Sequence, residues 1–146
     1  MIGCDMTRLD DFTFSLLAND EMIAIDQDPL GAGAAKIAAK APFEEIWARP
    51  LEDGSIAVGL LNAGFITTEM TFDLAAAGLE GAWKVRDVWR QQDEGEFSGT
   101  YRRKVFGHAT HLIRLWPEAG ARLRTGLRDI RDNAWLNEIE QARKAK

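Results

Sequence analysis

Carboxylates at the ends of apolar runs are the side chains of this sequence best suited to acid–base chemistry. Asp5 follows the apolar residues 2–4, so it is a candidate substrate contact, although we favour an ion pair with Arg8 or a helix cap. Asp26 and Asp28 lie two residues apart just before a proline, a position that favours turn and capping roles over a catalytic pair. We therefore assign no catalytic residue.

The tryptophans are the second group with a chemical use, because an exposed indole ring can stack on a sugar ring. We single out Trp47 and Trp89 as candidate substrate contacts. The alternative, which we favour, is that the tryptophans pack in a core or on a face between domains. Such a face would form an exposed apolar patch wherever the second domain is missing. The five tryptophans are Trp47, Trp83, Trp89, Trp116 and Trp135.

Cysteine and histidine are too few to build their usual metal sites. Cys4 is the only cysteine, which excludes an intrachain disulfide, and its apolar neighbours indicate a buried thiol. His108 and His111 are the only histidines; His108 follows a glycine and is expected in a turn, and His111 is expected in a strand. We predict no metal site and no cofactor.

The composition is that of a globular protein, with 46% hydrophobic and 28% charged residues. A net charge of −5 argues against a nucleic-acid partner held by phosphate contacts. No apolar run approaches the roughly 20 residues of a membrane helix, so no membrane partner is expected. The first residues lack a basic region followed by an apolar core, so we expect no signal peptide there, and the compartment stays open.

Residues 1–31 have the pattern of a strand followed by a helical connection. Asp10 precedes apolar residues at helical spacing, and Asn19 is a second candidate helix cap. Pro29 and Gly31 then end the helical segment. This is the pattern of a last unit of an α/β fold, and we expect it to be poorly packed or to dock on the rest of the chain in a way unlike a barrel.

Residues 32–117 alternate with period two, which is typical of strands with one buried face. Turn signals separate them at a spacing of about ten residues, which predicts an antiparallel β-sandwich with Greek-key-like connections. Asp53-Gly54 predicts a two-residue type I′ hairpin, and residues 91–95 predict a polar loop. The expected strands span residues 43–51, 55–62, 67–74, 83–89, 96–105 and 109–116, with a further strand beginning near Ile37.

Residues 118–146 change to helical spacing, carried by Leu123, Leu127, Ile130 and Ala134. The apolar stripe is narrow, so this C-terminal helix should dock on the sandwich or on a partner chain. The predicted fold is therefore mainly β, with a helix at its C-terminal end.

Several long stretches of the sequence resemble melibiase-type α-galactosidases. Residues 2–8 and 16–31 are similar to the end of the catalytic barrel of that family, and they read IGCDMTR and LLANDEMIAIDQDPLG. Residues 45–51, 53–58, 85–89 and 95–99 are similar to the C-terminal β-sandwich that follows the barrel, and they read EIWARPL, DGSIAV, VRDVW and GEFSG. The resemblance spans about residues 2–116.

The resemblance implies a retaining glycoside hydrolase with a (β/α)8 barrel, in which two carboxylates about 5–5.5 Å apart cleave the glycosidic bond. Those carboxylates lie on earlier barrel strands, and the similarity begins at the eighth. Residues 1–31 are thus a remnant of the last barrel unit. We expect a non-catalytic C-terminal portion of an enzyme of carbohydrate metabolism that hydrolyses terminal α-galactosides, inactive by itself. The family is often secreted or periplasmic.

Two alternatives stay open. The chain could be a stand-alone carbohydrate-binding or protein-interaction module that uses its aromatic face, with galactosides as ligands. It could also complete a barrel supplied by a separate polypeptide. The expected partners are accordingly a catalytic (β/α)8 barrel, another copy of the chain, or galactosides.

Overall fold

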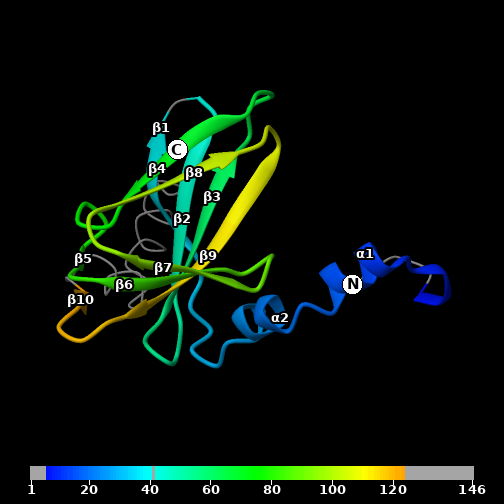
Figure 1. Cartoon of the computed structure of the whole chain (residues 1–146), viewed down its shortest axis with the longest axis horizontal. Coiled ribbons are helices and arrows are strands. Elements are labelled where there is room, and N and C mark those ends of the chain that lie inside the picture. Colours follow the sequence, from blue (N-terminus) through cyan, green and yellow to red (C-terminus); the bar gives the residue numbers. More distant parts are fainter. Residues whose placement is uncertain (1–5, 41, 124–146) are drawn as a thin grey trace, which may run out of the picture.

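The structure, a computed structural model, describes residues 6–40 and 42–123. It is mainly β (Figure 1). Three short helical segments precede the strands: η1 (Met6–Arg8), α1 (Asp11–Leu17) and α2 (Asp20–Asp26). The strands are β1 (Ala35–Lys40), β2 (Glu44–Pro50), β3 (Ile56–Asn62), β4 (Thr68–Asp73), β5 (Leu79–Glu80), β6 (Trp83–Asp87), β7 (Gln92–Phe97), β8 (Thr100–Val105), β9 (Ala109–Pro117) and β10 (Arg122–Leu123).

The strands form one large sheet and two short ribbons, all antiparallel. The large sheet has the order β1-β2-β3-β9-β6-β7, and β4 pairs with β8 and β5 with β10. Side chains of the β4–β8 ribbon, such as Met70 and Phe72, share one core with Val58 and Ile113 of the large sheet. The ribbon therefore covers the inner face of the sheet, which confirms the predicted sandwich.

Period-two alternation decides which side chains enter this core. In β3, Ile56, Val58 and Leu60 are buried, and β6 and β9 alternate in the same way. The face opposite the core is covered in part by α2, whose Ile25 packs against Leu51, Ala57 and Val88. The large sheet is thus covered on both faces only where α2 packs against it.

The prediction of one strand over residues 96–105 is wrong. Residues 92–97 form β7, so most of the predicted polar loop is a strand, and residues 100–105 form β8. Gly99, with φ +93°, allows the turn between them. Because β7 pairs with β6 and β8 pairs with β4, the chain crosses from one sheet to the other at this turn.

The type I′ hairpin predicted at Asp53-Gly54 is also wrong. That turn needs a positive φ at both residues, but only Gly54 has one (+83°). The N–H of Leu51 donates to the carbonyl of Ser55 (2.9 Å), so three residues form the loop. The Asp53 carboxylate accepts the backbone N–H of Ser55 at 2.9 Å, and this bond stabilises the longer loop.

The two N-terminal helices begin at the predicted caps. Asp10 accepts the N–H of Thr13 for α1, and Asn19 accepts the N–H of Met22 for α2. Figure 1 shows α1 projecting beyond the strands on the side of the N-terminus. The predicted strand at residues 2–4, and Asp5, lie outside the described residues.

The predicted helix over residues 118–146 is wrong for the part that the structure describes. Arg122 and Leu123 form β10 and pair with Glu80 and Leu79 of β5. Residues 124–146 lie outside the described residues. None of the described helices is long and apolar enough to cross a bilayer.

Candidate functional site: a buried polar cluster between the sheets

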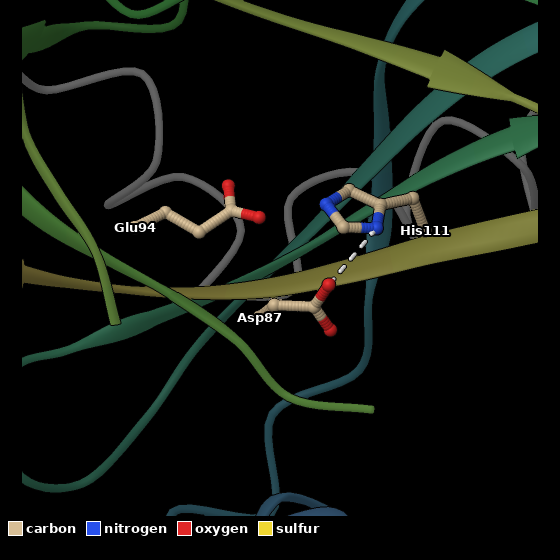
Figure 2. A group of neighbouring side chains, drawn as sticks. All are labelled: Asp87, Glu94 and His111. Carbon is tan, nitrogen blue, oxygen red and sulfur yellow. Dashed lines mark ion pairs between the residues drawn. The ribbon is translucent and has the colours of Figure 1, made fainter. Parts of the chain in front are cut away.

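Asp87, Glu94 and His111 form a cluster of titratable side chains, two of them buried and Glu94 partly buried (Figure 2). They come from the end of β6, the middle of β7 and the start of β9. One potential ligand atom of each residue lies within 4.8 Å of those of the other two. In the described part of the chain, this is the group of carboxylate and imidazole side chains that lie close enough together to hold one metal ion.

A β-bulge brings Glu94 into the cluster. Val85 pairs with Gly95 and Arg86 pairs with Asp93, so Glu94 has no partner on β6. Bulges of this kind redirect a side chain, and Gly95 has the positive φ (+102°) that the bend requires. The Glu94 carboxylate accepts the hydroxyl of Tyr101, from β8, at 2.6 Å.

Two arginines neutralise the carboxylates. The Arg90 guanidinium lies 2.6 Å from Asp87 Oδ2, and the Arg90 backbone N–H donates to Asp87 Oδ1 at 3.0 Å. Arg103 lies 2.8 Å from Glu94 Oε1 and 3.4 Å from Asp87 Oδ2. Two negative charges therefore face two positive ones, and a divalent cation would have to displace both guanidinium groups. These residues fit a structural ion-pair network better than a metal site.

The protonation states follow from burial and from these bonds. Burial would raise the pKa of Asp87, but the hydrogen bonds from Arg90 outweigh it and hold that pKa below its ordinary value of 3.8. Burial raises the pKa of Tyr101 far above its usual range, so the phenol keeps its proton and donates it to Glu94. His111 Nε2, 2.9 Å from the same phenol oxygen, is then assigned as the donor to it.

His111 makes the stability of the fold depend on pH near neutrality. Burial lowers its pKa from 6.5, and the nearby Asp87 (3.8 Å from Nδ1) offsets this only in part. Because the unfolded chain takes up this proton first, the free energy of unfolding should fall as the pH drops through about 6.5. Urea denaturation at pH 7.5, 6.5 and 5.5 should show a decrease of less than about 1.4 kcal/mol per pH unit.

The matched variants are His111→Gln and His108→Asn. The first should flatten the decrease, and the second should leave it unchanged, since His108 is exposed in a turn with φ +54° that asparagine tolerates. An unchanged slope in His111→Gln would show that other groups cause the pH dependence.

The predicted site residues do not form one site in the described part of the chain. Trp47, on β2, donates its indole N–H to Glu45 at 2.9 Å, and the Lys36 ammonium lies 5.6 Å from its ring centre. Trp89 follows β6, is 39% exposed, and lines a groove beside α1. Asp28 accepts the backbone N–H groups of Leu30 and Glu52, which is the predicted turn role.

The cluster itself was missed at the sequence level, although part of its signal is present. Alternation places Asp87 on the same face as Trp83 and Val85, and it places His111 with Ile113. The alternation thus puts each side chain on a face that carries apolar residues, but Asp87 was not singled out. Glu94 gives no such signal, because it enters the cluster only through a bulge in a segment predicted as a loop.

The fold and the cluster define a class: a β-sandwich domain whose buried charges are paired with one another and serve to join its sheets. Residues 44–115 match the family "Alpha galactosidase C-terminal beta sandwich domain". The sandwich of this chain therefore belongs to this family.

Curated relatives and solved structures agree with this assignment. The chain is 32% identical to an α-galactosidase of Cyamopsis tetragonoloba over 82% of its length, and 35% identical to one of Coffea arabica over 81%. These matches span 29% and 32% of the relatives. The crystal structure of α-galactosidase I from Mortierella vinacea is similar with a TM-score of 0.75 and 27% identity, over 81% of this chain and 32% of that one. The chain thus spans about a third of the length of its relatives.

A β-L-arabinopyranosidase of Geobacillus stearothermophilus has the same sandwich, with a TM-score of 0.71 and 25% identity over 79% of this chain and 26% of that one. Enzymes named for different sugars therefore carry similar sandwiches.

Proposed function

We propose that this chain is the non-catalytic C-terminal portion of a glycoside hydrolase that acts on terminal α-galactosides, and that its sandwich supports a catalytic (β/α)8 barrel. The relatives are named α-galactosidases, and the sandwich is attached to a catalytic barrel in homologues. Asp87 and Glu94 are held by arginines inside the sandwich, so they do not supply the free carboxylate pair that hydrolysis needs.

An exposed apolar surface on the N-terminal side carries this proposal. Phe12 and Phe14 of α1 are 71% and 58% exposed, and Phe106, between β8 and β9, is 70% exposed. Phe12 and Phe106 line one groove, and exposed apolar surface of this kind marks a protein–protein contact. It includes α1, at the N-terminal end of the described residues, which is the place for the contact with a preceding barrel (Figure 1).

A fusion experiment tests the proposal. The part of the Coffea arabica enzyme that precedes its aligned segment is joined to this chain, and hydrolysis of an aryl α-galactoside is measured. We expect activity from the fusion and none from the chain alone; Asp5→Asn in the fusion then tests Asp5 as a substrate contact. Hydrolysis by residues 1–146 alone, or a folded but inactive fusion, would contradict the proposal. An aryl β-L-arabinopyranoside serves as a second substrate.

The carbohydrate-binding alternative has less support. One face of the Trp47 ring lies near the Lys36 ammonium, and the Arg114 guanidinium lies 4.7 Å from the ring centre of Trp116. These cations compete with a stacked sugar for the indole faces.

A further inference from the structure

Arg49, on β2, is a partly buried cation that has no partner in the described part of the chain. Among those residues, its Nε is the one buried side-chain nitrogen or oxygen that makes no hydrogen bond. The neighbouring Ala48 points into the core, so Arg49 points to the opposite face of the large sheet. A guanidinium keeps its charge at all ordinary pH values, so a buried N–H group of Arg49 without an acceptor costs free energy of folding.

The other arginines on this face have acceptors. Arg49, Arg114 and Arg86 lie in one row of cross-strand neighbours that runs through β2, β3, β9 and β6. The Arg114 guanidinium lies 2.8 Å from Asp53 Oδ2. The Arg86 guanidinium lies 2.9 Å from Asp93 Oδ1. The described chain therefore supplies carboxylates to two arginines of the row and leaves the third unpaired.

The helix α2 lies on the same face, next to Arg49. Ile25 of α2 packs against Ala57, which is the cross-strand neighbour of Arg49 on β3. Glu21 of α2 forms an ion pair with Arg86. One acceptor for the arginine row thus already comes from the N-terminal segment that precedes the sandwich. A larger N-terminal domain that continues from this segment is well placed to supply the acceptor for Arg49.

We propose that Arg49 holds the catalytic barrel on the sandwich, with its guanidinium bound to a carboxylate of the barrel beside α2. This inference rests on the proposed function and deepens it, because it names the side chain that makes the contact. A guanidinium can donate two parallel hydrogen bonds to one carboxylate, and this pairing would satisfy the buried Nε–H. The chain spans about a third of the length of its relatives, and in homologues the sandwich is attached to a barrel.

The inference predicts that one substitution has opposite effects in two contexts. Arg49→Met removes the charge and keeps most of the apolar part of the side chain. In the chain of residues 1–146, the Tm should stay the same or rise by about 1–3 °C, because an unpaired buried group is lost. In the fusion with the Coffea arabica segment, the same change should lower the Tm of the first transition by about 3–6 °C, because the barrel carboxylate loses its partner. Arg49→Lys, which keeps the charge without the two parallel N–H groups, should lose about half as much. Thermal unfolding followed by circular dichroism measures all of these.

Arg102→Met is the matched control. Arg102 is exposed on β8 next to the buried Tyr101, so its side chain points away from the core on the side of the β4–β8 ribbon. Its replacement should change the Tm by less than about 1 °C in both contexts.

Two results would overturn the inference. A lower Tm for Arg49→Met in the chain of residues 1–146 would show that the partner of Arg49 lies within this chain, and this measurement does not need the fusion. An unchanged Tm in the fusion would show that the barrel does not bind Arg49. Hydrolysis by the fusion is measured separately. An inactive fusion that shows the opposite effects contradicts the proposed function alone, and an active fusion that lacks them contradicts this inference alone.

Discussion

Replacing Asp87 by alanine should lower the free energy of unfolding by about 2–4 kcal/mol, because its buried carboxylate joins groups from three strands and the following turn. The backbone N–H of Arg90 loses its acceptor, and the guanidinium groups of Arg90 and Arg103 lose a shared negative charge. Both arginines keep some contact with solvent, and Arg103 keeps Glu94, so the loss stays below that of a fully buried unpaired charge.

Thermal unfolding followed by circular dichroism would measure this as a decrease in Tm of roughly 6–12 °C. Asp93→Ala is the control: this carboxylate pairs with Lys84 and Arg86, but it is half exposed, and its removal should cost about 1 kcal/mol or less. Because the pKa of Asp87 is held below 3.8, its contribution should be present above about pH 4 and be lost as the pH falls further. Equal losses in the two variants would show that the cluster adds nothing beyond a surface ion pair.

Replacing Phe72 by alanine should cost more, about 3–5 kcal/mol. Phe72 is 2% exposed on β4 and packs into the core that the β4–β8 ribbon shares with the large sheet. Its removal leaves a cavity where the two layers meet, and the ribbon has only two strands with which to adjust. Urea denaturation measures the loss.

Phe65→Ala is the matched control, because the same atoms are removed from a side chain that is 83% exposed in the loop just before β4. Its effect on the free energy of unfolding should stay within about 0.5 kcal/mol. Similar losses from the two variants would mean that β4 does not pack against the large sheet as described.

The local sequence pattern was sufficient to predict the structure wherever burial of one face of a strand determined the conformation. The alternation in residues 55–62 and 109–116 predicted β3 and β9 and the direction of their side chains, including His111. The caps at Asp10 and Asn19 were also visible, because a cap depends only on its next few residues.

The pairing between strands from distant segments could not be predicted from the local sequence pattern. The segment 91–105 reads as a polar loop and one strand, yet it forms two strands in different sheets, because β6 and β4 supply their partners. The bulge at Glu94 depends on the register of β7 against β6. It places the Glu94 carboxylate beside Asp87 and His111.

The amino-acid sequence by itself determined the family, the sandwich and the inward direction of the side chains of β3, because these depend on period-two burial and on long stretches of similar residues. Only the tertiary structure decided that the charged cluster is paired internally and that α1 and Phe106 form one groove. Those facts depend on contacts between segments up to about a hundred residues apart, and such contacts leave no local pattern in the chain.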